Sequence, residues 1–392
     1  APFKAGGQHM IKAGWHFGRE TYHGLETFNP VDLLGVSDRL VERIGFTPPA
    51  NVGADQNQYT FFLQDKWTVG KRFTIDAGLR FDRNSIADEG HVAPRVGFAY
   101  VLSGDNKTVL RGGFGLFYDR VNLNVASFLG LPQRTETRFS PAGAVIEKQS
   151  YVHRIEDRIR DPRSTSWSLQ LDRQVASNLI VRAGYQQRIT SRNFTLNPEF
   201  TPAANFLTLS NNGRDRYREF ELSGHYTFGK TGQLTASYVR SSAIGNLNDF
   251  NTYFGNVPQP VIRSDARSRL AFDAPNRFVL WSTLSAPFKF RLSPAVDIHT
   301  GFPYSIVNEF RDFVGPRNYA GRFPRYASVD LEVLRPFHLP VIGKTVTIGM
   351  GWFNLLNHFN PIDFQNNLAS PRYGIYTFSH DRVAAARLMI GL

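Results

Sequence analysis

The sequence predicts an all-β fold, a transmembrane antiparallel β-barrel, and three features of the chain support this prediction. About fourteen stretches of roughly ten residues alternate apolar with polar residues or glycine, so each strand has one apolar and one polar face. The connections between these stretches alternate short and long, as in barrels with tight periplasmic turns and long external loops. The even number of stretches places both chain ends on the periplasmic side.

Residues 73–82 show the alternation most plainly, with apolar side chains at odd and polar side chains or glycine at even positions. The expected strands are residues 9–20, 58–68, 73–82, 94–102, 108–119, 165–174, 179–190, 218–228, 234–242, 277–285, 292–306, 327–337, 345–355 and 381–392. The expected short turns lie near residues 69–72, 103–107, 175–178, 229–233, 286–291 and 338–344. We expect antiparallel strands only, negligible helix, and a structured external loop over residues 120–163.

The alternation also predicts which side chains meet lipid. The outward set is Phe73, Ile75, Leu79, Leu110, Leu116 and Leu331, and the inward set is Asp76, Arg80, Arg111 and Glu332. Aromatic residues make up 14% of the chain, and many lie near strand ends, including Trp15, Trp67, Tyr118, Trp167 and Trp281. Amphipathic rings favour the lipid–water boundary, so we interpret them as aromatic girdles. Core packing in a soluble β-sandwich is the alternative.

Composition excludes several classes of protein. An apolar fraction of 42% is too high for a disordered chain, and no window of about eighteen apolar residues predicts a transmembrane helix. The absence of cysteine excludes disulfides and thiolate sites. The net charge is +12, but the arginines are scattered and no nucleic-acid motif accompanies them. We therefore expect attraction to lipopolysaccharide or an anionic solute, and no nucleic-acid partner.

Several blocks of sequence resemble the barrel of TonB-dependent outer-membrane receptors, and most of all the Oar-like branch, whose members carry a carboxypeptidase-regulatory-like domain. The blocks are Phe62–Trp67, Leu79–Asp82, Ala93–Phe98, Val109–Arg120, Ser166–Gln170, Thr300–Tyr304 and Phe353–Leu355 with Leu356 and Asn357. Their order and spacing cover nearly all of the chain from about residue 8. The resemblance implies residence in the bacterial cell outer membrane.

The resemblance also implies a larger protein and a function. Family barrels have roughly 22 strands around a plug domain with a TonB box, and neither plug nor TonB box is visible in residues 1–392. We therefore expect this chain to be the C-terminal part of such a barrel, with a complete small barrel as the alternative. The implied function is uptake of a bulky solute, energised through TonB acting on the plug. A structural barrel that anchors a surface assembly is the alternative function.

No residue pattern predicts catalysis, a cofactor or a metal site, because the histidines are scattered and no nucleophile elbow or zinc motif occurs. We therefore expect no enzyme, although an outer-membrane lipase or protease was the third possibility. The candidate lumen-facing residues are Arg80, Arg95, Arg111 and Arg182. The alternative interpretation is that they pair with inward carboxylates such as Asp76, Asp82, Asp119 and Glu221. Solute contacts are also expected in the long loops.

Overall fold

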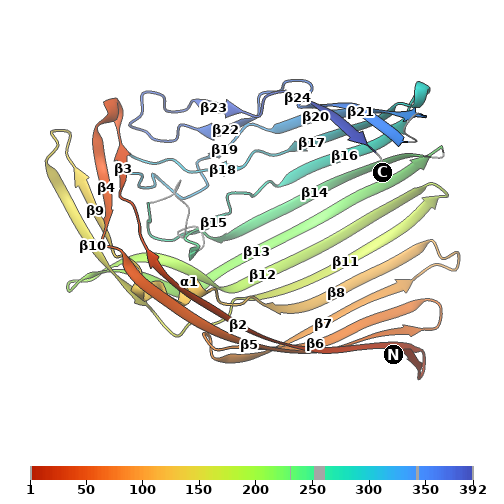
Figure 1. Ribbon diagram of the computed structural model, residues 1–392, viewed down its shortest axis with the longest axis horizontal. Coiled ribbons are helices and arrows are strands. Elements are labelled where there is room, and N and C mark those ends of the chain that lie inside the picture. The colour runs from red at the N-terminus through yellow and green to blue at the C-terminus, as the bar shows by residue number, and fades with distance from the viewer. Residues whose placement is uncertain (1, 230, 251–260, 341–343, 391–392) are drawn as a thin grey trace.

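The structure, a computed structural model, describes residues 2–229, 231–250, 261–340 and 344–390, and within these ranges fourteen long strands form one antiparallel ladder (Figure 1). The ladder runs in the order β2 (Gln8–Glu26), β5 (Ala50–Val69), β6 (Phe73–Asn84), β7 (Glu89–Val101), β8 (Thr108–Tyr118), β11 (Arg163–Ala176), β12 (Leu179–Phe200), β13 (Asn205–Phe228), β14 (Gly232–Asn246), β16 (Asn276–Ser285), β17 (Arg291–His299), β20 (Tyr326–Leu339), β21 (Lys344–Phe353) and β24 (Val383–Ile390). The predicted fold class is confirmed.

Short turns join alternate strands at one end of the ladder, which we call the turn end. The turns between β5 and β6 and between β7 and β8 lie where the sequence predicts them, and Gly70 and Asn106 have φ angles of 61° and 60° there. Glycine and asparagine tolerate this left-handed conformation best. Residues 230 and 341–343, within two other expected turns, lie outside the described residues. The beginning of β2 and the end of β24 also lie at the turn end (Figure 1).

Several strands extend further than the alternation predicts. β12 continues to Phe200 and β13 begins at Asn205, although the expected strands covered residues 179–190 and 218–228. Beyond the membrane a paired strand no longer needs an apolar outer face. The alternation of apolar and polar residues in the sequence therefore ends there, although the backbone hydrogen bonds between the strands continue. The expected strand 292–306 is shorter instead, because β17 ends at His299. Residues 391–392 of the last expected strand lie outside the described residues.

The long connections gather at the opposite end, the loop end, where a smaller sheet forms (Figure 1). It contains β3 (Val31–Leu34), β4 (Leu40–Phe46), β9 (Arg134–Phe139) and β10 (Val145–Ile155). The expected structured loop over residues 120–163 supplies the last two strands, together with α1 (Leu123–Ala126) and the 3-10 turn η2 (Phe128–Gly130). Shorter elements are β1 (Pro2–Lys4), η1 (Val36–Asp38), β15 (Arg267–Arg269), η3 (Pro287–Lys289), β18 (Pro303–Tyr304), β19 (Gly321–Arg322), β22 (Pro361–Phe364) and β23 (Tyr376–Ser379).

The expectation of antiparallel strands only is wrong at the loop end. β10 pairs with β13 in parallel, from Tyr151 opposite Asn205 to Ile155 opposite Leu209. Parallel pairing needs a crossover connection, and here the long excursion through β11 and β12 provides it. Among the described residues, no helix is long and apolar enough to cross a membrane.

The register of the ladder sorts the side chains onto two faces. Arg80 lies opposite Phe62 of β5, whereas Leu79 lies opposite Leu63. Followed across the ladder, the same register places Phe73, Ile75, Leu79, Leu110, Leu116 and Leu331 on one face, the apolar face. Asp76, Arg80, Arg111 and Glu332 lie on the other, the arginine face. This separation agrees with the sequence prediction at all ten positions.

One expected girdle residue lies on the wrong face. Trp15 is on the apolar face with 75% of its surface exposed, as a lipid-facing ring should be. Trp281 instead lies opposite Thr235 and Ala295, on the arginine face with Asp297. The run Phe278–Trp281 is continuously apolar, so alternation does not decide which of its residues faces lipid.

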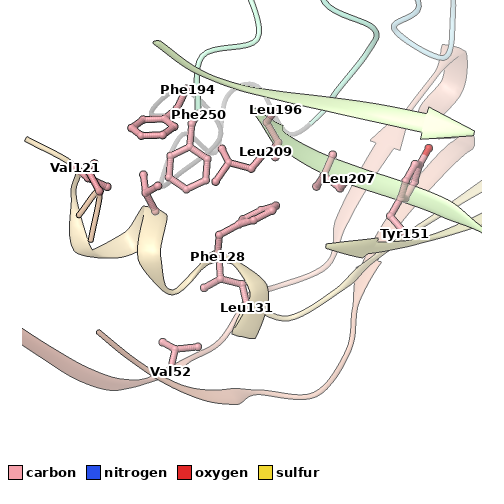
Figure 2. Packing of buried hydrophobic residues seen from close by; sticks show 12 residues of the cluster. Val52, Val121, Phe128, Leu131, Tyr151, Phe194, Leu196, Leu207, Leu209 and Phe250 are labelled. Carbon is pink, nitrogen blue, oxygen red and sulfur yellow. The ribbon is translucent and has the colours of Figure 1, made fainter. Parts of the chain in front are cut away.

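The main cluster of buried apolar residues lies at the loop end, where the extended ends of ladder strands meet α1 and η2. Figure 2 shows Phe128 of η2 packed between the residues of α1 and the extended ends of β12 and β13. Its fully buried members include Phe128, Leu196, Leu207 and Leu209, with Phe250 edge-on to Phe128 at 5.8 Å between ring centres. Apolar burial of this kind is the main driving force for compact packing in water. The loop end is therefore a folded structure with its own packed core.

We predict that single cysteines will report the two faces, since the chain has no native cysteine. In protein inserted into lipid vesicles, a membrane-confined maleimide should label Leu331→Cys and Leu79→Cys and spare the adjacent Glu332→Cys and Gly78→Cys. Successive residues of a strand point to opposite faces, so each pair is its own control. The reverse labelling pattern would show that the register is wrong.

A second prediction concerns His153 of β10, which is buried, stacks on Phe128 at 4.5 Å and has Nδ1 3.1 Å from the Phe128 carbonyl oxygen. Burial lowers the pKa of His153 below its ordinary value of 6.5. The neutral ring is thus favoured in the folded loop end. Its stabilising contribution is present above about pH 6.5 and is lost as pH falls through the lowered pKa.

Hydrogen exchange of residues 123–131, corrected for intrinsic rates, should therefore increase between about pH 7.5 and pH 5. His153→Asn keeps a donor for the Phe128 carbonyl but does not titrate, and it should flatten this pH dependence. His338→Asn, at an exposed position of the turn end, is the control and should change nothing. Equal pH dependence in the His153→Asn variant would contradict the assignment.

Candidate functional site

The four candidate arginines all lie on the arginine face of the ladder. The Nε atom of Arg80 is 2.7 Å from Asp82 Oδ2. Arg111 and Arg182, on different strands, both contact Asp172, with Nε–O distances of 3.0 and 2.8 Å. The Arg95 guanidinium lies 4.5 Å from the centre of the Phe117 ring, within cation–π distance. That this face lines the lumen of a closed barrel stays a prediction.

The carboxylate partners are only partly those expected. Asp82 is paired as proposed, but the carboxylate shared by two arginines is Asp172, which sequence reasoning did not single out. Asp76 instead accepts a hydrogen bond from Gln64, and Glu221 accepts one from Ser237. A groove of about 440 Å³ lies along this face beside Arg80 and Arg95. Three of the four arginines thus contact a carboxylate, two of them the same one, and this favours the structural interpretation for them.

A larger cavity, of about 740 Å³, lies at the loop end. Its walls come from the ends of β12, β13 and β14 and from the connections around residues 261–272, 303–323 and 363–366. Its lining includes the arginines Arg263, Arg311 and Arg317 and the rings of Phe194, Phe313, Tyr304, Phe323 and Phe364. Convergence of rings and a few charged groups in a cleft is typical of ligand sites. Sequence analysis expected solute contacts in the long loops but named none of these residues.

Arg317 is a partly buried cation of this cavity. Its guanidinium lies 4.3 Å from the centre of the Phe313 ring, and Nη1 donates to Asn248 Oδ1 at 2.6 Å. Burial lowers its pKa to about 10, because the charged form loses hydration. At neutral pH Arg317 is therefore still charged. It presents a weakly hydrated cation to the cavity.

A group of charges, which we call the loop ion cluster, contacts this cavity through Arg263. It comprises Glu42, Glu136, Arg138, Arg263 and Asp312. Arg263 Nη2 is 3.3 Å from Glu42 and its Nε is 2.5 Å from Asp312, while Arg138 Nη2 is 3.0 Å from Asp312. Burial raises the pKa of Glu42, whose side chain is fully inaccessible. The cluster ties β4 and β9 of the small sheet to two distant connections.

The stretch 151–163, the end of the expected external loop, combines exposed and buried charges. Arg158 and Arg160 are part exposed and contact Glu89. Asp161 is buried, accepts hydrogen bonds from Asn84 at 2.7 Å, and lies 3.0 Å from His91. Burial raises the pKa of Asp161. Tyr118, expected in a girdle, stacks on His91 at 4.1 Å. These contacts join the loop to the ends of β6 and β7.

We predict that Arg263→Met loosens the loop end without affecting the ladder. Removal of one partner from a buried ion pair leaves an uncompensated charge and costs about 3–5 kcal/mol. Hydrogen exchange of residues 134–139 and 308–313 should rise. Arg43→Met removes an exposed bidentate pair with Asp32, and such surface pairs contribute about 0–1 kcal/mol, so this control should be near neutral. Equal effects of the two variants would contradict the importance of the cluster.

Comparison with known proteins identifies the fold. Residues 86–312 match the family described as outer membrane beta barrel domain. No curated protein matches the chain. Among solved structures, it is similar to the outer membrane transporter YddB from Escherichia coli, with a TM-score of 0.66 and 13% identity over 99% of this chain and 53% of that chain.

Two other solved structures are similar at comparable levels. The ferric-catecholate import receptor Fiu from Escherichia coli gives a TM-score of 0.59 at 12% identity, over 99% of this chain and 53% of that chain. The siderophore receptor PiuA from Acinetobacter baumannii gives 0.58 at 11% identity, over 99% and 54%. The chain spans about half the length of these proteins, and likeness at this identity shows the fold alone. Since the family match covers more than half of its residues, the chain belongs to the outer membrane beta barrel domain family and lies in the outer membrane.

Proposed function

We propose that this chain is the barrel portion of an outer-membrane receptor that takes up a bulky solute, with energy supplied by TonB acting on a plug domain. The observation that carries the proposal is the cavity of about 740 Å³ at the loop end. In outer-membrane barrels the long loops face the exterior, so this cavity is open to solutes outside the cell. The transporters and receptors with a similar fold support the same role.

The cavity is built for binding with little rearrangement. Arg317 is held by Asn248 and Phe313, and Arg263, which also lines the cavity, is held by the loop ion cluster. Preorganised groups lose little conformational freedom on binding, so more of the interaction energy appears as affinity. Arg311 is the more accessible cation, and no carboxylate among the described residues lies within ion-pair distance of it. Three aspartates, Asp215, Asp249 and Asp363, also line the cavity, so it offers a solute both signs of charge.

We also propose that further strands complete the barrel, as the Oar-like resemblance implies. β2 pairs with β5 and, over three residues, with β1, while β24 pairs with β21. Among the described residues, β2 and β24 do not pair with each other. Bare backbone groups in lipid cost several kcal/mol each, so partners for these two edges are expected. A closed cylinder would also give the arginine face a lumen.

A role without catalysis is part of this proposal. The alternative function is a structural barrel that anchors a surface assembly, and the small sheet of β3, β4, β9 and β10 favours it as a projecting platform. The two functions differ in what they need. Uptake requires a solute bound in the loop-end cavity and dependence on TonB, whereas anchoring requires neither.

The experiment uses the full-length gene product, purified from outer membranes, incubated with extracts of the growth medium and washed. Native mass spectrometry then detects small molecules that remain bound. We expect a bound solute, with binding weakened roughly tenfold by Arg311→Gln, since a charge-assisted contact contributes about 1.5–3 kcal/mol. Arg325→Gln, at an exposed arginine outside the cavity lining, is the matched control and should bind normally.

Accumulation of the identified solute in cells should require both this gene and TonB. A solute that binds but accumulates equally without TonB would refute energised uptake. Failure to retain any small molecule, together with loss of a surface structure on gene deletion, would favour the anchoring function.

A further inference from the structure

A second pocket, of about 510 Å³, lies on the apolar face where the ladder meets the loop end. Its lining comes mainly from the outward side chains of β12, β13 and β14 and from the connections around residues 269–275 and 319–322. Glu219 and Ser241 also line it, although the register places them on the arginine face, where Glu219 accepts a hydrogen bond from Tyr217. Four of its residues are arginines, namely Arg218, Arg240, Arg269 and Arg322, and the rings beside them are Tyr185, Phe220 and Tyr319. A basic pocket on the face that meets lipid is not explained by uptake through the barrel.

The position along β13 places this pocket at the edge of the hydrocarbon. The outward residues of this strand change from Arg214, Arg216 and Arg218 to Phe220 and Leu222. From Arg218 the strand continues to Phe228 at the turn end, a length close to the roughly 9–11 residues that a tilted strand needs to cross the membrane. Arginine deep in lipid is costly, so Arg218 lies at the level of the outer headgroups.

The neighbouring strands agree with this level. Register places Arg240 directly opposite Phe220, and Tyr238, two residues nearer the turn end, donates its hydroxyl to Asn276 at 2.8 Å. Trp167 and Tyr185 contact each other at 5.0 Å between ring centres on the same face. Aromatic residues with a polar tip concentrate at membrane boundaries. The register places Trp167 in the row of Arg218, and Tyr185 in the row of Phe220 and Arg240, so these arginines lie among boundary rings.

These boundary arginines lack carboxylate partners. Within the described residues, no Asp or Glu lies within ion-pair distance of Arg218, Arg240 or Arg269. Arg240 donates to the neutral Asn276 Oδ1 at 2.7 Å, and Arg269 lies 4.4 Å from the centre of the Tyr319 ring. Arg322 alone is neutralised, by Asp273. On the arginine face, by contrast, Arg80, Arg111, Arg182, Arg277 and Arg387 each have a carboxylate.

We propose that this pocket binds the phosphate groups of lipopolysaccharide, the phosphorylated glycolipid of the outer leaflet. Guanidinium groups bind phosphate oxygens through paired hydrogen bonds, and unpaired guanidiniums at headgroup level carry the complementary charge. Phe220, Leu222 and Tyr185 then lie beside the acyl chains below. The site rests on the membrane location of the barrel and not on the solute. Its test is therefore independent of the uptake function.

The test measures binding of a defined lipid to the full-length protein, purified from outer membranes in mild detergent. The probe is fluorescent lipid A carrying both phosphates. Attraction of about 1 kcal/mol per surface arginine corresponds to roughly fivefold in affinity, so Arg218→Gln combined with Arg240→Gln should weaken binding roughly 30-fold. The matched control, Arg72→Gln combined with Arg291→Gln, removes two exposed arginines at the turn end and should bind normally.

A second comparison uses only the wild-type protein and therefore does not depend on the folding of any variant. Lipid A with both phosphates removed should bind much more weakly than the phosphorylated form, and added salt should narrow the difference. Equal binding of the dephosphorylated lipid would overturn the proposal. Equal binding of phosphatidylglycerol would overturn the assignment to lipopolysaccharide, and an equal loss in the turn-end control would show that net charge, not this pocket, attracts the lipid.

Discussion

The need to pair every backbone group in lipid is the constraint on which the rest of this structure depends. A strand in hydrocarbon has no water to satisfy its N–H and C=O groups, so it must pair along its whole length. The continuous antiparallel register from β2 to β24 meets this need. Once the register is set, each side chain has only one face available. A slip of one residue would turn Arg80 or Arg111 toward lipid.

At the loop end this constraint is lifted, and the chain folds by different rules. Water can satisfy exposed backbone groups there, so a parallel strand pair, a four-residue helix and irregular connections all occur. Stability comes instead from a buried apolar cluster around Phe128 and from the loop ion cluster around Arg263. The exterior surface is therefore shaped by ordinary packing on a rigid scaffold. Because of this separation, residues of a loop-end cavity can vary while the membrane-spanning strands stay unchanged.

Arginine has three different environments in this protein, and each follows from where the strands place it. On the arginine face, Arg111 and Arg182 share Asp172, which offsets part of their positive charge. In the loop-end cavity, Arg317 is held between an aromatic ring and an amide. At the outer boundary of the membrane, Arg218 has no carboxylate partner within the described residues. Unpaired arginines such as Arg218 are therefore available to anions of the outer leaflet.

The sequence by itself determined the membrane strands, their short turns and the face of most side chains, since alternation and turn chemistry are local properties. It did not determine Trp281, because a continuously apolar run carries no alternation. It also missed the extensions of β12 and β13, which no longer need an apolar face. Only the tertiary structure showed that Asp172 joins Arg111 across 61 residues and that Arg263 meets Glu42 across 221. Such contacts depend on how distant strands and loops pack against one another, and the local sequence around each residue does not specify that packing.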